Sequence, residues 1–533
     1  MRDSFRQSMT WLHTWVSLLV CWILYFVFIT GSLGYFDAEI DRWMQPTIPM
    51  PADSISIVNS IQLAQVHLQA NAPEAYAWYI NPPVDRNEPY LWVAFDALLN
   101  ESGGEGTYSG VDLDPITGEP ILFRDTGGGQ TLYKMHYALH YIPDLIATLF
   151  IGLCTMLMLL GLITGIFIHN KIFREFFTFR PNKKVLSWID AHNMFGVMSL
   201  PFHIMITYSG LIMFLFTYMP LIVAGAYNFE SEDYQRFGDE YLSSGLEQTE
   251  RSGVKAQVMD LTKLYYSAEK RLGESQVRRM QVYQPGDANA VAIFETLISH
   301  PVNRGKEVSF SAVTGEFISS YEVTDTPQLT FDATLELHEG LFAGTGLRWL
   351  YFISGILGAA MIATGAILWT VKRRKREYER PEGPSRGFVL VEGLNIGTIV
   401  GLPVAIVIYF WANRLLPLGM TDRAEWEVHC LFITWGILLI HGIWYSKNGA
   451  TIRGWRNQLI MAVAVFGLLP IINIFTTDRS LWTSIVSHDW IFVGVDMLCI
   501  SIALASVLVI RYLPDKTSFE VKRKSPPPRF IND

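Results

Sequence analysis

Nine of the twelve histidines lie within long apolar segments or at their edges, where ionisable side chains are rare. A single histidine at such an edge usually hydrogen-bonds a carbonyl group or water, but a set of nine indicates a function. Imidazole nitrogens can exchange protons, and they bind zinc, copper and haem iron. The nine are His13, His136, His140, His169, His192, His203, His338, His429 and His441.

The spacing of these histidines favours haem. His192 and His203 are 11 residues apart, which places them on nearly the same face of a helix at depths that differ by about 16 Å. His140 and His169 are 29 residues apart, again close to a whole number of turns, over about 43 Å. A b-type haem with two axial imidazoles needs histidines at matching depth on neighbouring helices. Two haems at different depths would form an electron path across a membrane.

Other uses of the histidines find less support. A proton relay would favour carboxylates inside the apolar segments, where Glu392 and Asp496 are the main candidates. A hydrolytic zinc site would show H-E-x-x-H, which the sequence lacks. A copper or zinc site at His136 and His140 stays open. The four cysteines form no C-x-x-C-H motif, which excludes covalent c-type haem.

The elements that must position the histidines are transmembrane helices. The chain has 533 residues, of which 50% are hydrophobic and 17% charged, too apolar for an ordinary soluble enzyme. We expect the third helix to be interrupted by Pro201 and Pro220, and the first to be a retained anchor. Eight segments are long enough to span about 30 Å of hydrocarbon, near residues 11–35, 145–168, 194–224, 349–371, 388–410, 428–445, 459–475 and 490–510.

The distribution of Lys and Arg predicts the orientation. Basic residues cluster before the first helix, in 171–184, in KRRKR at 372–376, in 447–456 and in the tail at 522–524, all on one side of the predicted helices. By the positive-inside rule both termini are cytoplasmic, and the inserts 36–143 and 225–340 lie outside. The inserts are acidic, and the chain carries no nucleic-acid-binding signal.

The two inserts resemble each other. Residues 111–121 (VDLDPITGEPI) match residues 308–318 (VSFSAVTGEFI) at a constant offset of 197, and each predicts a strand that enters a hairpin at Thr-Gly-Glu. A helix-like stretch precedes each, at 54–70 and 255–272, so each insert is expected to be a small α+β module. His136 precedes Thr164-Gly165 much as His338 precedes Thr364-Gly365. This indicates a duplicated unit of one outer module plus one helix.

Seven short motifs resemble the PepSY-associated transmembrane helix family, which includes bacterial inner-membrane ferric-siderophore reductases. They are LHTW (12–15), MHYALH (135–140), TGIFIH (164–169), FTFRP (177–181), DAHN (190–193), LPFH (200–203) and LHEG (337–340). The resemblance covers residues 1 to about 375. It implies a haem-binding four-helix core with PepSY-like periplasmic modules that passes electrons outward to ferric chelates. By motif match, the implied haem ligands are His13, His136, His140, His169, His192, His203 and His338.

We therefore expect a mostly α, polytopic membrane protein in the bacterial inner membrane, with about eight transmembrane helices and two small α+β PepSY-like periplasmic modules. The expected function is that of an oxidoreductase, a ferric-siderophore reductase with two haems b and no other metal. The expected divisions are helix 1 (1–35), module 1 (36–143), helices 2 and 3 (144–224), module 2 (225–340), helix 4 (341–375), a four-helix extension (388–512) and a cytoplasmic tail (513–533).

The sequence leaves the electron donor and the role of the extension open. No strand-G-x-G-x-x-G-helix unit is present, so electrons must come from a membrane quinol or a separate cytoplasmic reductase. The basic loop 171–184 would dock such a reductase. Alternatively, its positive charge only sets the orientation of the chain in the membrane. The role of the extension, with His429 and His441, stays open. It would hold a quinone site, provide a surface for a partner protein, or serve structural packing alone. The alternative function is a haem-free anchor that presents PepSY-like modules for protein binding or peptidase inhibition. That alternative leaves the spacing of the histidines in the apolar segments unexplained.

Overall fold

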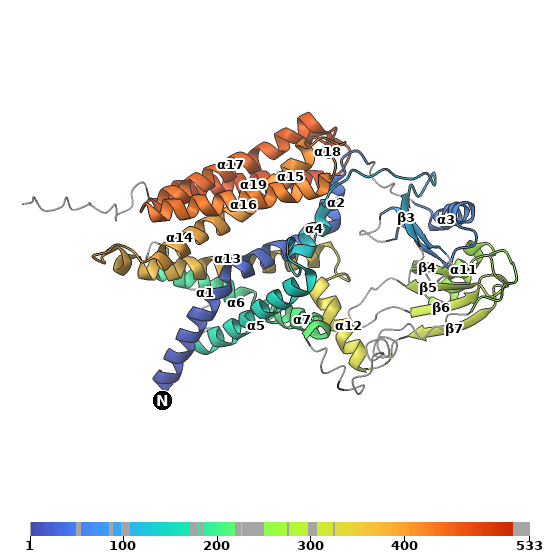
Figure 1. The fold of residues 1–533 in the computed structure, drawn as a ribbon, viewed down its shortest axis with the longest axis horizontal. Coiled ribbons are helices and arrows are strands. Elements are labelled where there is room, and N and C mark those ends of the chain that lie inside the picture. The colour runs from blue at the N-terminus through green and yellow to red at the C-terminus, as the bar shows by residue number, and fades with distance from the viewer. Residues whose placement is uncertain are drawn as a thin grey trace, which may run out of the picture. The chain divides into compact units, whose positions relative to one another are not determined.

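The computed structural model divides the chain into two compact units (Figure 1). The helical unit comprises residues 1–47, 124–214 and 344–533, and the sheet unit comprises residues 48–123 and 215–343. The residues described are 2–48, 55–84, 89–97, 107–169, 179–181, 183, 185–218, 225, 250–273, 277–296, 306–322, 324 and 326–514.

The helical unit contains seven helical segments long and apolar enough to cross a membrane among the described residues, or eight if one bent pair counts as a span. This confirms the expected membrane class and helix number. The segments are α1 (Arg2–Gly34), α5 (Asp144–Ile168), the bent pair α6 (Val185–Met198) and α7 (Leu200–Met213), α13 (Thr345–Tyr378), α14 (Arg386–Ile399) with α15 (Gly401–Leu415), α16 (Arg423–Lys447), α17 (Thr451–Thr476) and α19 (Trp490–Tyr512).

The bend between α6 and α7 is 65° and lies at Ser199. Pro201 sits in the first turn of α7, where its missing N–H costs no intrahelical hydrogen bond. The expected interruption at Pro201 is therefore confirmed, whereas Pro220 lies outside the described residues. The helix begins at Val185, earlier than the apolar stretch from 194 suggested. Its polar Asp190 is tolerated there because the Arg180 guanidinium donates two hydrogen bonds to the carboxylate, of 2.9 and 2.7 Å.

Four of these segments form one group, because α1 packs against α5 and α13, α13 against α6, and α5 against α7. Their basic end is the end at which Arg6, Arg180 and Lys372 lie. Their insert end is the end from which the chain continues into the sheet unit. The core between them is apolar and includes Leu24 and Ile362.

The extension α14–α19 packs as a second group, whose long helices run alongside one another in Figure 1. It is fastened to the first group by specific hydrogen bonds. The Trp22 indole N–H donates to Asn395 Oδ1 (3.0 Å), Asn395 Nδ2 donates to the Ala366 carbonyl (3.0 Å), and the Tyr25 hydroxyl donates to the Ile399 carbonyl (3.0 Å). The extension therefore supports both α1 and α13.

Short helices and loops close the insert end of the helical unit: α2 (Asp37–Met44), α4 (Gly128–Met135) and α18 (Leu481–Val486). A fully buried ion pair joins Arg423 and Glu427 of α16. Glu427 also accepts hydrogen bonds from the Thr126 hydroxyl (2.6 Å) and the Gly127 N–H (3.1 Å). These bonds satisfy a carboxylate that burial would otherwise penalise, and they fix the loop that precedes α4.

The sheet unit holds one seven-stranded antiparallel sheet in the order β3-β2-β1-β4-β5-β6-β7. β1 (Ala77–Asn81), β2 (Leu91–Asp96) and β3 (Tyr108–Leu113) come from the first insert. β4 (Val277–Tyr283), β5 (Val291–Thr296), β6 (Lys306–Ser311) and β7 (Phe317–Glu322) come from the second. β1 and β4 pair at the centre, so the two inserts share a single sheet. Among the described residues, the helices of the unit are α3 (Ile57–Asn71), the short α8 (Leu215–Tyr218), α11 (Leu261–Leu272) and α12 (Thr326–Glu339).

Local chemistry explains where the two inserts differ from expectation. The second helix begins at 261 rather than 255, because Asp260 accepts a hydrogen bond from the Thr262 N–H and caps it there. The predicted hairpin forms in the second insert as β6 and β7, but the first insert shows only an isolated bridge between Leu113 and Pro120. Pro120 matches Phe317 at the offset of 197. A proline lacks the N–H that a sheet ladder requires.

Candidate cofactor site

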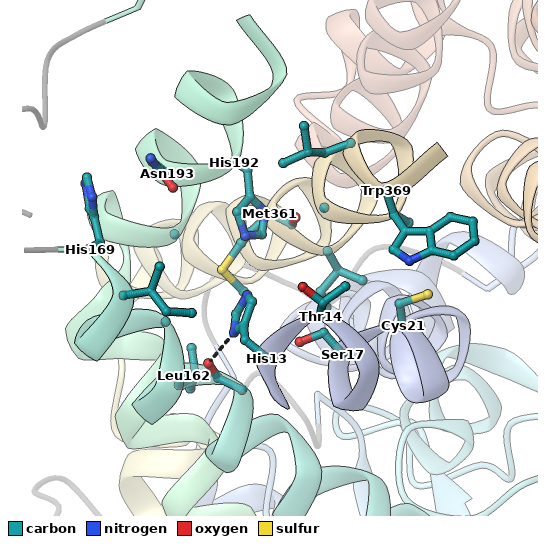
Figure 2. A pocket seen from close by; sticks show the side chains of 18 of the residues that line it. His13, Thr14, Ser17, Cys21, Leu162, His169, His192, Asn193, Met361 and Trp369 are labelled. Carbon is teal, nitrogen blue, oxygen red and sulfur yellow. Dashed lines mark hydrogen bonds between the residues drawn. The ribbon is translucent and has the colours of Figure 1, made fainter. Parts of the chain in front are cut away.

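A cavity of about 670 Å³ lies in the helical unit between α1, α5, α6 and α13, toward the basic end (Figure 2). Its size falls within the range of about 300 to 1,000 Å³ that is typical of ligand pockets. Three of the seven predicted ligand residues line it: His13 from α1, His169 from the end of α5, and His192 from α6.

His13 is held by α5. Its Nδ1 lies 2.9 Å from the Gly161 carbonyl oxygen and 3.2 Å from the Thr164 hydroxyl. A carbonyl oxygen can only accept a hydrogen bond, so Nδ1 carries the proton and Nε2 of the neutral ring keeps its lone pair. A Cβ built on Gly165 would lie 3.4 Å from the His13 ring, which is close contact. α5 therefore provides both an anchor and a glycine surface for His13.

His192 is held by α13 in the same way. Its Nδ1 donates to the Met361 carbonyl oxygen at 2.8 Å, which again leaves Nε2 unprotonated. The Thr364 hydroxyl donates to the same carbonyl at 3.0 Å. A Cβ on Gly365 would approach the His192 ring to 3.0 Å, so even an alanine there would press on the imidazole.

The two anchors are equivalent positions of an internal repeat. Gly161, Thr164 and Gly165 on α5 correspond to Met361, Thr364 and Gly365 on α13 at a constant offset of 200. On α5, His13 donates a hydrogen bond to the Gly161 carbonyl and its ring packs against Gly165. On α13, His192 donates to the Met361 carbonyl and its ring packs against Gly365. The Thr-Gly pairs seen in the sequence as repeat markers are thus the surfaces on which the cavity histidines lie.

The ring centroids of His13 and His192 are 6.3 Å apart, with an interplanar angle of 66°. Neither Nε2 has a hydrogen-bond partner among the described residues. A histidine nitrogen binds a metal at about 2 Å. Two such bonds, plus the radius of an imidazole on each side, give nearly the observed centroid separation. The residues present therefore fit the iron of a haem b, which His13 and His192 would hold.

The cavity histidines differ in how firmly they are held. His169 caps the end of α5 and lines the cavity, yet no side-chain hydrogen bond fixes its ring within the described part of the chain. Figure 2 shows it off to one side, whereas His13 and His192 approach the same space from opposite helices. The inner pair that the structure brings together is therefore His13 and His192.

His203 lies deeper, on α7, and does not line the cavity. It is completely buried, with Nε2 next to the Ser199 hydroxyl (2.9 Å) and the Ser354 carbonyl (3.4 Å). Its Nδ1 is buried without a partner. This hydrogen-bonding pattern is the reverse of that at His13 and His192.

The histidines at the insert end contact other elements. His136 follows α4, and its Nδ1 contacts the Tyr133 carbonyl. His140 Nε2 lies 2.9 Å from the Glu425 carboxylate of α16, and the neighbouring Tyr141 hydroxyl lies 2.6 Å from His429 Nδ1. His338 belongs to α12 of the sheet unit. The contacts of His140 and Tyr141 with the extension could not be foreseen, because no local sequence pattern relates α16 to this loop.

The rim of the cavity is basic. Arg6, Arg180, Lys372 and Arg373 line it, against a single carboxylate, Asp190, among its described lining residues. No cluster of three or more histidine, cysteine or acidic side chains suited to a metal ion occurs in the described part of the chain. Among those residues, the chemistry of the site therefore rests on two histidines and a positive rim.

Comparison with known proteins identifies the family of the chain. The model of the PepSY-associated TM region matches residues 10–372, which include α5, α6, α7 and most of α1 and α13. The chain belongs to the PepSY-associated transmembrane family. The match confirms the resemblance given by the sequence motifs, and it ends before the extension α14–α19. No curated protein matches the chain.

Proposed function

We propose that this PepSY-associated protein binds haem b between His13 and His192 and carries electrons through the membrane to a ferric chelate of the siderophore class. The observation that carries the proposal is the pair of imidazoles in one cavity, each with Nδ1 bound to a carbonyl and Nε2 available. Haem held there would supply reversible one-electron exchange at its iron.

Under this proposal, the residues around the two imidazoles position the rings for haem binding. The Gly161 and Met361 carbonyls hold each imidazole in the tautomer that presents Nε2, and such partners also make the ligand nitrogen more basic. Gly165 and Gly365 provide room for the rings. The remaining predicted ligands of the helical unit, His136, His140 and His203, are proposed to serve a second haem nearer the insert end. His338 stays a ligand predicted from its sequence motif.

The proposed substrate suits the sequence. Reduction of Fe(III) to Fe(II) takes one electron and needs no acid, base or nucleophile at the chelate. Hard oxygen chelators bind Fe(II) far less tightly than Fe(III), so reduction releases the iron. The proposed donor is a membrane quinol, which gives two electrons and two protons and so reduces two ferric ions, or a separate cytoplasmic reductase. The proposed location is the bacterial inner membrane, with the inserts in the periplasm.

The cofactor can be tested on purified protein. Full-length protein from haem-supplied cells should show a Soret band that shifts on dithionite reduction, and acid acetone should extract the colour because no cysteine motif holds haem covalently. The expected content is two haems per chain. A folded sample without a Soret band would refute the proposal and favour a haem-free anchor that binds proteins through its sheet unit.

The substrate can be tested on the same sample. The protein is reduced without oxygen, and candidate ferric siderophores are added with a ferrous trap. Prompt reoxidation with stoichiometric trapped Fe(II) is expected. Protein that stays reduced with every ferric chelate, yet reoxidises with quinone or a soluble acceptor, would replace the ferric reductase with a general electron-transfer role.

A further inference from the structure

Three hydrogen-bond donors near the end of α13 line the cavity, and none of them is hydrogen-bonded to a carboxylate among the described residues. The three are Trp369, Lys372 and Arg373. The Trp369 indole N–H is buried without an acceptor. Lys372 makes no ion pair or hydrogen bond among the described residues, and Arg373 makes only a 3.4 Å hydrogen bond to the Trp369 carbonyl. These donors are concentrated within five residues of one helix.

Asp190, the carboxylate among the described lining residues of the cavity, is already hydrogen-bonded to Arg180. Asp190 accepts from Arg180 Nε at 2.9 Å, from Arg180 Nη2 at 2.7 Å and from the Arg180 backbone N–H at 3.0 Å. Arg6, the remaining cation of the rim, donates to the Ile168 carbonyl at 3.1 Å. The described lining therefore carries more positive than negative charge, and neither Lys372 nor Arg373 forms an ion pair within the described part of the chain.

Topology alone does not explain this arrangement. The positive-inside rule accounts for basic residues at this end of α13. It does not account for their lining a cavity, nor for an indole N–H buried beside them without an acceptor. A buried donor without a partner, such as the Trp369 N–H, is costly. A ligand that supplies acidic oxygens at this rim would remove that cost.

We infer that Trp369, Lys372 and Arg373 form a carboxylate-binding rim, which receives the two carboxylates on one edge of the haem. The inference rests on the proposed function and adds to it an orientation for the cofactor, with its charged edge at the basic end of the helices. Arg373 also packs over the rings of Trp369 (4.2 Å) and Trp15 (6.0 Å), which limits the positions its guanidinium can take.

The test compares haem with its dimethyl ester, which has the same ring but no free carboxylates. Haem-free full-length protein is titrated with each, and binding is followed by the Soret band. Wild-type protein should bind haem at least about tenfold more tightly than the ester, because charge-assisted hydrogen bonds are strong. In the double variant Lys372→Gln, Arg373→Gln this preference should largely disappear, while the affinity for the ester stays close to that of wild type. Trp369→Phe should reduce the preference to a smaller degree.

A matched control is available on the same helix. Lys375 and Arg376 have side chains 75% and 76% exposed and pair with Glu379 and Glu377, so Lys375→Gln, Arg376→Gln removes the same charge away from the cavity. This control should keep the wild-type preference. If the Lys372, Arg373 double variant also keeps it, the rim is refuted, and lost retention of anionic phospholipid in that variant would assign it to lipid instead. If wild-type protein binds neither compound, the proposed function itself fails.

Discussion

At the scale of single residues, the cavity histidines are distinguished by what their Nδ1 atoms contact. The sequence motifs implied that His13, His169 and His192 are all haem ligands, but only His13 and His192 are anchored by carbonyls of a neighbouring helix. An anchored imidazole enters binding with its orientation already fixed, so it loses less freedom than a mobile one. The three histidines should therefore differ in their effect on haem.

We predict that His13→Ala and His192→Ala each lower haem retention at least about tenfold, in the range seen when metal-site shells are disrupted. His169→Ala should leave most of the haem bound, because its ring lacks such an anchor. Haem content per chain after purification, with the redox midpoints, measures the difference. Equal losses in all three variants would show that the anchors do not select the ligands.

Gly365 gives a second prediction at this scale. The added Cβ of Gly365→Ala would lie 3.0 Å from the His192 ring and force it to shift. We expect weaker haem binding and a changed absorption spectrum, with little loss of helix. Gly346→Ala, on the same helix with nothing within 4 Å of the new Cβ, is the control and should resemble wild type. The prediction is wrong if both variants give the wild-type spectrum.

The sequence revealed the candidate ligands but not their pairing. Histidines at matching depth could be recognised from residue spacing, since helix geometry fixes rise and angle. The anchors could not be recognised in this way, because they are the backbone carbonyls of Gly161 and Met361, and every residue type has a backbone carbonyl. The reversed environment of His203 depends in the same way on Ser199 and Ser354, which come together only when α7 packs on α13.

At the scale of elements, prediction succeeded where one residue decides the outcome locally. Pro201 broke its helix as expected, and the match between the inserts reappears as two turns with the same hydrogen bonds. Asp114 accepts from the backbone N–H groups of Ile116 and Thr117, and Ser311 accepts from those of Val313 and Thr314. Prediction failed where partners are distant, as in the central pairing of β1 with β4, which joins two segments about 200 residues apart.

One turn of the sheet unit depends on a single carboxylate. Burial of Asp287 disfavours its charge, but hydrogen bonds from the Asn289 N–H, the Ser252 hydroxyl and N–H, and the Gly253 N–H outweigh burial and lower its pKa to about 2. A carboxyl pKa lowered by folding stabilises the fold above the unfolded value of about 4. That contribution is lost as the pH falls from about 4 through about 2.

We therefore predict that Asp287→Asn reduces the hydrogen-exchange protection of the Ser252, Gly253 and Asn289 amides near neutral pH. The difference from wild type should shrink as the pH falls from about 4 to about 2, because the wild-type carboxyl then takes up a proton. Hydrogen exchange on the full-length protein, read by mass spectrometry at each pH, measures the effect. A difference that stays constant over this range would contradict the assigned role.

At the scale of the whole molecule, the chain combines a family core with an extension that the family match does not include. The extension is fastened to α1 and α13, the helices that carry His13 and the His192 anchor. Its contacts with His140 and Tyr141 bring it to the insert end as well. We therefore regard it as a support for the core.

The orientation in the membrane can be tested with single cysteines. Thr117 and Thr314 are exposed at equivalent turns of the two inserts, and Lys183 and Lys375 are exposed at the basic end. In a background without native cysteines, Thr117→Cys and Thr314→Cys should react with a membrane-impermeant maleimide once the outer membrane is opened. Lys183→Cys and Lys375→Cys should react only after the inner membrane is lysed, because the positive-inside rule places them in the cytoplasm. The reverse labelling would invert the topology.

The central pairing of β1 with β4 has a consequence for biogenesis. The first three strands leave the ribosome long before β4, and the chain that makes α5, α6 and α7 must be threaded into the bilayer in between. Until β4 arrives, β1 presents an open edge, and open edges invite pairing with the wrong chain. A chaperone that shields this edge, or a pause before translation of the second insert, would favour correct assembly. Newly made protein should pass through a protease-sensitive stage that ends only when β4 has paired with β1.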